Sequence, residues 1–89
     1  AEIERCLQTH EAVLEVAVLG VADQKWGEVG KAFIVAADSS LSEQDIVDFC
    51  QGRLARFKIP KHIVFVTDIA KTESGKIDRR KLANIPHNQ

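Results

Sequence analysis

The apolar positions of the first 19 residues predict a short helix followed by a strand. Ile3, Cys6 and Leu7 have the i, i+3, i+4 spacing of one helix face, which predicts a helix over residues 2–10 with a charged opposite face. Residues 13–19 (VLEVAVL) are rich in β-branched side chains and end before a glycine. This composition predicts a largely buried strand.

A second apolar run follows a segment that is rich in glycine. Residues 31–36 (KAFIVA) predict another strand. The joining residues 20–30 hold three glycines and Trp26, the only tryptophan of the chain. Because this segment is long for a hairpin turn, we expect it to form a loop.

The helical pattern is clearest after Ser42. Ser42 and Asp45 have the spacing of a capping box, with Asp in place of the usual Glu, and this predicts the start of a helix. Gly52 weakens such a helix by about 1 kcal/mol relative to alanine, and Pro60 cannot continue it. One apolar stripe predicts its buried face: Ile46, Phe49, Cys50, Leu54 and Phe57.

The last third of the chain predicts a strand, a polar segment and a short helix. Residues 62–66 (HIVFV) predict the third strand, and residues 67–80 are polar and basic. Asp78 suits the N-cap of a last helix that frays toward Pro86. The order helix, strand, strand, helix, strand, helix predicts a small α+β domain. We expect its helices to pack on a short, mainly antiparallel or mixed three-stranded sheet.

Length and composition limit what the chain can do alone. With 89 residues, 45% of them hydrophobic, it is expected to be one small soluble domain with one modest core. It is too short for a deep pocket with its own walls, so we do not expect a complete enzyme. No apolar run approaches the roughly 20 residues of a membrane span, and no signal segment opens the chain. The expected location is the cytoplasm.

The cysteines and histidines show no pattern of a metal site or a disulfide framework. Cys6 and Cys50 lie in different segments, without the close pairing of zinc ligands or the density of disulfide scaffolds, so we interpret both as core thiols. His10, His62 and His87 form no recognisable ligand set. We therefore expect no metal site.

The net charge of −1 hides a strong asymmetry. Residues 1–45 carry a net charge of −6, whereas residues 46–89 carry +5. A positive second half could attract phosphate-rich ligands, RNA or an acidic partner surface.

Residues 71–77 (KTESGKI) form the most informative segment. Gly75 lets the backbone turn sharply directly before Lys76, which projects an ammonium group beyond the body of the domain. A phosphate-binding P-loop would need glycine where Ala70 stands and serine or threonine where Ile77 stands, so that motif is excluded. Taken alone, the letters SGK are typical of a solvated turn.

Five segments, taken in order, change this interpretation. They are EIE at residues 2–4, THEAV at 9–13, GVAD with WGE across 20–28, FKIPK at 57–61, and KTESGKI at 71–77 followed by Arg79 and Arg80. Together they resemble the C-terminal domain of the adenylate-forming (AMP-binding) superfamily, most closely that of acyl-CoA synthetases. The resemblance extends to about Leu82, while Glu11 and Ala70 stand where the family commonly has proline.

The resemblance implies that residues 1–89 are the mobile C-terminal domain of an AMP-forming acyl-CoA ligase. The N-terminal domain, which binds ATP and a carboxylic acid, and the hinge would be absent from this sequence, so the chain alone is expected to be inactive. Lys76 matches the lysine that the family inserts into the active site during adenylation. The intact enzyme would use ATP, Mg²⁺ and CoA, and a lysine acetyltransferase could act on Lys76, as in relatives.

The resemblance also implies a face for CoA. The WGE segment of CoA-forming members lies near the path of the coenzyme, so Trp26 either contacts CoA or forms a lid over the sheet. Phe57, Lys58 and Lys61 match residues that lie close to the nucleotide of CoA, where a ring stacks on adenine and lysines meet phosphates. Phe57 also continues the helix stripe, which favours core packing.

The preferred function is therefore one domain of an acid–CoA ligase of fatty acid metabolism. It would supply Lys76, preceded by Gly75 in the binding loop, for adenylation, and after a rotation it would offer its CoA face for thioester formation. Two alternatives stay open: an adenylation domain that serves a carrier protein, and a stand-alone basic binding module. The chain lacks the interleaved aromatic and basic pattern of single-strand RNA binders, so we expect no nucleic acid partner.

Overall fold

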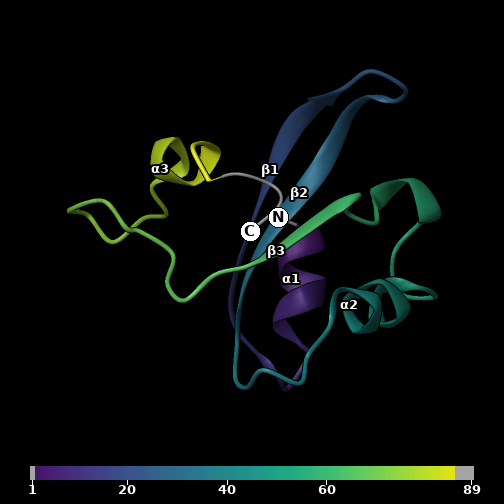
Figure 1. Cartoon of the computed structure of the whole chain (residues 1–89), viewed down its shortest axis with the longest axis horizontal. Coiled ribbons are helices and arrows are strands. Elements are labelled where there is room, and N and C mark those ends of the chain that lie inside the picture. Colours follow the sequence, from purple (N-terminus) through teal and green to yellow (C-terminus); the bar gives the residue numbers. More distant parts are fainter. Residues whose placement is uncertain (1, 86–89) are drawn as a thin grey trace.

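The computed structural model describes residues 2–85. Its elements are α1 (Glu2–Gln8), β1 (Val13–Asp23), β2 (Gly27–Ala36), α2 (Glu43–Cys50), the 3-10 helix η1 (Arg56–Lys58), β3 (His62–Phe65) and α3 (Arg79–Ala83). The α-helices and strands follow the expected order, and η1 is an addition to it. Figure 1 shows them. The described strands form one sheet in the order β1-β2-β3, with β1 antiparallel and β3 parallel to β2. The prediction of a small α+β domain with a mixed sheet is confirmed.

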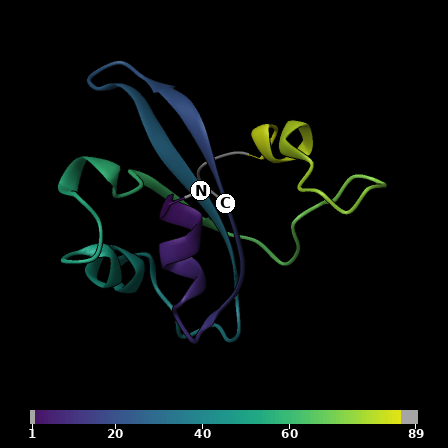
Figure 2. The same cartoon turned by 180° about the vertical axis from the view of Figure 1, so that it is seen from behind.

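The alternation of side chains along the strands separates two apolar clusters, one on each face of the sheet. Figure 2 shows α1 in front of the strands, on the face that α1 and α2 cover. The first cluster comprises Leu7, Val13, Val16, Ala32, Ile34, Ile46, Cys50, Leu54 and Ile63. The second cluster, below α3, comprises Ala17, Phe33, Val35, Val64, Ile69 and Leu82. The sheet is therefore covered on both faces, and α3 is held on one of them.

The expectation of a long loop at residues 20–30 is wrong. Both strands continue into this segment and leave only a three-residue turn between them. Gly20 pairs with Gly30 across the two strands. A glycine lacks a side chain but keeps both backbone hydrogen-bonding groups, so two facing glycines do not interrupt the pairing. The result is a long hairpin whose tip extends beyond the rest of the sheet, as Figure 1 shows.

The start of α2 agrees with its capping-box sequence. Ser42 Oγ accepts a hydrogen bond from the backbone N–H of Asp45 at 3.1 Å, and the Asp45 carboxylate accepts one from the N–H of Ser42 at 2.9 Å. Stabilisation of the charged carboxylate by the Ser42 N–H, and then by its hydroxyl, lowers the pKa of Asp45. Both contacts define the first turn of the helix.

The end of α2 differs from the expectation. The helix stops at Cys50, and Gly52 has a φ of +84°, a left-handed conformation that ends a helix and favours glycine. Leu54 is still buried, but outside the helix. Phe57 lies in η1 and is 81% exposed, so its assignment to the buried stripe is wrong. The helical spacing of apolar residues continues past Cys50 in the sequence, but the backbone is no longer helical there.

Polar contacts hold the start of the final helix, α3, and the residue that follows its C-cap. Asp78 caps its start by accepting a hydrogen bond from the N–H of Lys81 at 3.2 Å, as the sequence predicted. Lys31, a strand residue that is only 8% exposed, donates through Nζ to the carbonyl of Ile85 at 2.8 Å. This bond ties the segment that follows α3 to β2. The fraying expected toward Pro86 lies outside the described residues.

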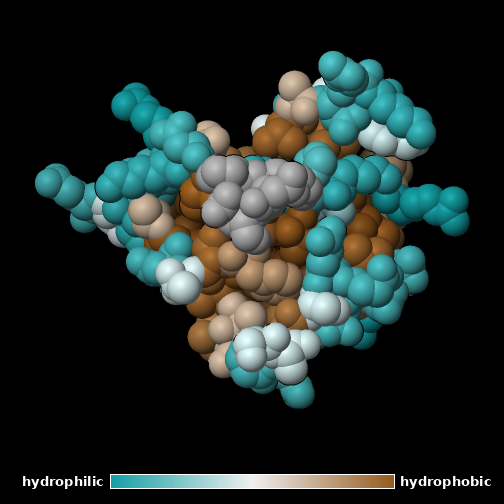
Figure 3. Space-filling model, in the orientation of Figure 1, coloured by the Kyte–Doolittle hydropathy of each residue, from teal (hydrophilic) through white to brown (hydrophobic). Residues whose placement is uncertain are grey.

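Cys6 and Cys50 are free thiols, and both belong to or pack against the first cluster. Cys50 is buried, which raises the pKa of its thiol, and Cys6 is partly exposed but packs against the same cluster. Figure 3 shows apolar residues at the centre of one face and hydrophilic residues around its outer parts. Four large apolar side chains of the described residues are exposed: Leu14, Trp26, Phe57 and Phe65.

Candidate functional site

A narrow loop of residues 70–78, here called the lysine loop, carries Lys76. Its neck is closed by backbone hydrogen bonds, from the N–H of Asp78 to the carbonyl of Ala70 at 2.8 Å and from the N–H of Thr72 to the carbonyl of Lys76 at 2.7 Å. The loop thus has two short stems, the first at Lys71 and the second at Ile77, which pair in an antiparallel arrangement like a very short hairpin. The loop is therefore a defined structure and not an unstructured tail.

The turn of the lysine loop depends on Gly75. Its φ is +87°, a conformation that costs other L-residues roughly 1–2 kcal/mol, and its N–H donates to the carbonyl of Thr72 at 2.9 Å. The next residue, Lys76, is exposed, and its ammonium group makes no hydrogen bond or ion pair with residues 2–85. Lys76 is therefore available to a group that lies outside this chain.

The tip of the β1–β2 hairpin presents Trp26. Asp23 Oδ1 accepts hydrogen bonds from the N–H of Lys25 at 2.8 Å and of Trp26 at 2.9 Å. The bond from Trp26, followed by that from Lys25, lowers the pKa of Asp23. The turn leaves the indole 58% exposed, which disfavours the interpretation of Trp26 as a lid over the sheet.

Trp26 lies beside η1 and the segment that follows it. The N–H of Lys61 donates to the carbonyl of Gly30 at 3.0 Å, which holds this segment against β2. The Nζ of Lys61 lies 5.0 Å from the centroid of the Trp26 ring, within the range of a cation–π contact. An open groove of about 510 Å³ results, and it is lined by Trp26, Glu28, Val29, Arg56, Phe57 and Lys61.

The structure brings together three of the four residues expected at a CoA face. Trp26, Phe57 and Lys61 line the groove. Lys58 does not line it, although its Nζ lies 5.8 Å from the centroid of the Phe57 ring. Its Nζ lies 2.6 Å from a carboxylate oxygen of Glu2 on α1, and this hydrogen bond and the charge of Lys58 lower the pKa of Glu2. Sequence reasoning missed Arg56, although it directly precedes the FKIPK segment.

The two candidate regions lie at opposite ends of the molecule. In Figure 1 the lysine loop reaches the far left, while the hairpin tip and η1 lie on the right, along a longest axis of 35 Å. Gly75 and Lys76 are thus separated from the groove that holds Trp26 and Phe57. The two regions cannot act on the same atom at the same time.

The described residues offer no metal centre. No group of three or more His, Cys, Asp or Glu side chains among residues 2–85 is placed to hold an ion. The Nδ1 of His10 accepts the N–H of Ala12 at 3.0 Å, and the His10 ring contacts Phe49 edge-on. His87 lies outside the described residues. Within the same part of the chain, no helix has the length and apolarity needed to cross a bilayer.

Known proteins resemble this chain in sequence. The family described as "AMP-binding enzyme C-terminal domain" matches residues 2–76. A 2-succinylbenzoate–CoA ligase of Listeria innocua is 52% identical over 81 residues, which are 91% of this chain and 17% of that protein. The long-chain-fatty-acid–CoA ligase FadD13 of Mycobacterium tuberculosis is 47% identical over 77 residues, 86% of this chain and 15% of that protein. The chain thus spans about one sixth of these relatives' length.

A solved structure shares the fold. The o-succinylbenzoate CoA synthetase of Bacillus subtilis, in complex with an acyl-adenylate intermediate, superposes with a TM-score of 0.87 and 33% identity. The match covers 99% of this chain and 18% of that protein. The family match, the identities and the fold agree with the motifs at both ends of the molecule. The chain therefore belongs to the C-terminal domains of the AMP-binding, adenylate-forming enzymes.

Proposed function

We propose that this chain is the C-terminal domain of an AMP-forming acid–CoA ligase and that Lys76 supplies the cation for adenylation. Lys76 carries the proposal: it is exposed, it has no ion pair with residues 2–85, and it follows a left-handed glycine in a closed loop. A larger N-terminal domain of the same protein would bind ATP and the carboxylic acid. Relatives named as CoA ligases support a CoA acceptor over a carrier protein.

The chemistry explains the need for a lysine. In adenylation a carboxylate oxygen forms a bond to the α-phosphorus of ATP, and the bond from that phosphorus to the leaving pyrophosphate breaks. Two anions approach each other, and negative charge develops on the phosphoryl oxygens. A compact ammonium group that bridges acyl and phosphoryl oxygens offsets this repulsion, and the slim lysine stem reaches into a cleft. We expect the intact enzyme to use Mg²⁺ together with ATP.

The groove supplies the second half of the proposal. The exposed rings of Trp26 and Phe57 offer stacking faces for adenine, and Arg56 and Lys61 offer charges for phosphates. Because the groove and the lysine loop lie at opposite ends, one domain could present them in turn by rotating on its larger partner. The thiol of CoA would then attack the acyl-AMP and release AMP.

The exposure of Lys76 also suggests how the enzyme could be regulated. Acetylation would remove the charge of the ammonium group while keeping the stem, so a lysine acetyltransferase that reached this loop would block adenylation. The cytoplasmic location and the role in fatty acid metabolism stay predictions.

The proposal is tested by replacing Lys76 in the parent enzyme. Lys76→Ala should lower acid-dependent pyrophosphate release by about 10²–10³-fold, the range for removal of a preorganised electrostatic group. Lys81→Ala is a matched control, because Lys81 is an exposed lysine of the adjacent helix α3 whose ammonium has no described partner. Pyrophosphate release that survives in Lys76→Ala at the control level would refute the assignment.

A further inference from the structure

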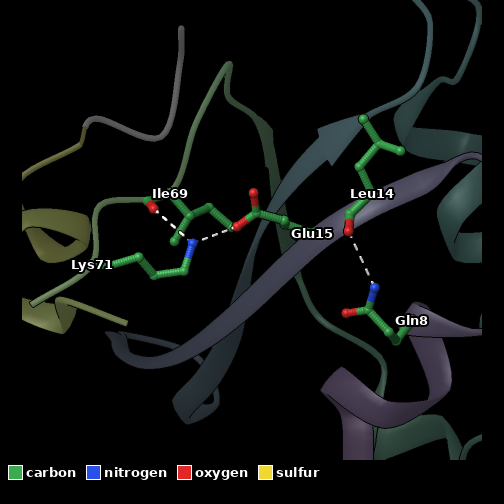
Figure 4. A network of polar contacts seen from close by, with 5 residues as sticks. All are labelled: Gln8, Leu14, Glu15, Ile69 and Lys71. Atoms are coloured by element: carbon green, nitrogen blue, oxygen red, sulfur yellow. Dashed lines mark hydrogen bonds and ion pairs between the residues drawn. The ribbon is translucent and has the colours of Figure 1, made fainter. Parts of the chain in front are cut away.

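The outer edge of β1 is covered by side chains instead of another strand. The carbonyl of Leu14 accepts a hydrogen bond from Gln8 of α1 at 3.3 Å (Figure 4), and the N–H of Val18 donates to Glu4 of the same helix at 2.8 Å. The carbonyl of Val18 accepts a hydrogen bond from Arg79 Nη1 at 3.1 Å. An uncovered strand edge would leave these groups open to pairing with another chain.

Both ends of the lysine loop are attached to this edge. At the first stem, Lys71 Nζ lies 2.6 Å from a carboxylate oxygen of Glu15 on β1 and also donates to the carbonyl of Ile69 at 3.1 Å, as Figure 4 shows. Just after the second stem, Arg79 bonds the carbonyl of Val18 and lies 3.6 Å from Glu4. The two attachment points on β1 are three residues apart.

These polar contacts supplement an apolar base. Ile69 is buried in the second cluster and Ile77 packs against it, so the root of the loop is held by packing. Residues 71–76 are exposed, so core packing does not orient this part of the loop. The contacts of Lys71 and Arg79 are side-chain contacts that tie the two ends of the loop to β1 and α1. A displacement of about 1 Å at a reacting centre can cost on the order of 10²-fold in rate.

We propose that Lys71 and Arg79 are positioning residues for adenylation, and that Glu15 and the carbonyl of Val18 are their anchors on the edge of β1. This inference rests on the proposed role of Lys76. Neither residue would touch a substrate. Each would hold the lysine loop in the orientation that delivers the Lys76 ammonium group to the reacting phosphoryl group.

The ion pair is tested by a double-mutant cycle in the parent enzyme. Lys71→Met and Glu15→Gln should each lower the kcat of adenylation about threefold to fivefold, the range expected for a half-exposed pair, with the KM for ATP unchanged. The double variant should lose no more than the worse single variant, because both remove the same contact. Lys71→Arg, which keeps a charged donor, should retain most of the parental kcat of adenylation.

Arg79 is tested separately because its anchor is a backbone carbonyl. Arg79→Gln should lower the kcat of adenylation about tenfold, since hydrogen bonds from charged donors are stronger than neutral ones. For every variant, conversion of supplied acyl-AMP to thioester should stay at the parental rate. Glu11→Gln is the matched control for Glu15→Gln, because Glu11 is an exposed carboxylate four residues earlier with no described partner.

Lys76→Ala, assayed in parallel, separates the two proposals. If Lys76→Ala keeps adenylation, the proposed function itself fails. If Lys76→Ala loses adenylation while the Lys71 and Glu15 variants match Glu11→Gln, the positioning inference fails alone. The positioning inference would also be overturned if the variants lost both half-reactions equally, or if a fall in melting temperature accounted for the loss. Additive effects in the double variant would overturn it as well.

Discussion

At the scale of single residues, two glycines have the same left-handed backbone conformation but lie in different parts of the fold. Gly75 in the lysine loop and Gly52 after α2 have φ values of +87° and +84°, and a Cβ at either would meet no atom within 4 Å. The cost of an alanine at either position is therefore conformational strain alone, without a clash. The pair separates an effect on local geometry from an effect on stability.

Gly75→Ala should impair adenylation because it shifts the turn directly before Lys76. Strain of roughly 1–2 kcal/mol lowers the population of the productive loop by about 5–30-fold, and the kcat of adenylation should fall by a similar factor. Gly52→Ala should lower the free energy of unfolding by a comparable amount and leave that kcat unchanged. Urea unfolding measures the free energy of unfolding, and pyrophosphate release measures the kcat of adenylation. Equal kcat values in the two variants would show that the Gly75 turn does not position Lys76.

The capping box gives a prediction about pH. Hydrogen bonds from Ser42 hold the pKa of Asp45 below its ordinary value of 3.8 in the folded chain. A carboxylate with a depressed pKa stabilises the fold above the unfolded value, and this stabilisation is lost as the pH falls through the folded value. Urea unfolding between pH 5 and pH 2 should therefore show a smaller loss of stability in Asp45→Asn than in the parent chain. If the free energy of unfolding depended on pH in the same way in both chains, protonation of Asp45 would not be linked to folding.

At the scale of elements, the exposed aromatic residues stand apart from the core. Phe33 is fully buried between the sheet and α3, whereas Trp26 at the hairpin tip and Phe57 in η1 are largely exposed. An exposed ring that contributes little to folding but lies in a groove is typical of a binding surface.

Removal of these rings should separate stability from binding. Trp26→Ala and Phe57→Ala should change the free energy of unfolding by no more than about 0.5 kcal/mol, the usual range for surface positions. Phe33→Ala should cost about 3–5 kcal/mol, because it opens a cavity in the core. Chemical denaturation of the three variants gives the comparison. A large loss in Trp26→Ala or Phe57→Ala would assign these rings to packing.

The predictable elements are those whose signals are local. The capping box of Ser42, the N-cap of Asp78 and the β-branched run of residues 62–66 each lie within a few residues, and all three predictions are confirmed. The length of the hairpin was missed because two facing glycines keep their pairing without any side-chain pattern. The groove could be predicted only in part, since it joins Trp26 to residues 56–61, which are distant in the sequence.

At the scale of the whole molecule, the lysine loop and the groove are open surfaces of the described residues 2–85. The lysine loop supplies a cation, and the groove supplies rings and charges, but neither surrounds a nucleotide. The purified 89-residue chain should therefore release no pyrophosphate from ATP in the presence of any carboxylic acid, because one cation without a cleft gives no positioning. Acid-dependent release in proportion to the amount of chain would disprove this.

The central claim is that the two ends of this domain serve different half-reactions. The most direct measurement assays acyl-AMP formation, and separately thioester formation from supplied acyl-AMP, in the parent enzyme and in its Lys76→Ala, Lys61→Ala and Lys81→Ala variants. We predict that Lys76→Ala loses only the first step and that Lys61→Ala raises the KM for CoA in the second, while Lys81→Ala retains both. Loss of both steps to the same extent in either Lys76→Ala or Lys61→Ala would contradict the division between the two ends.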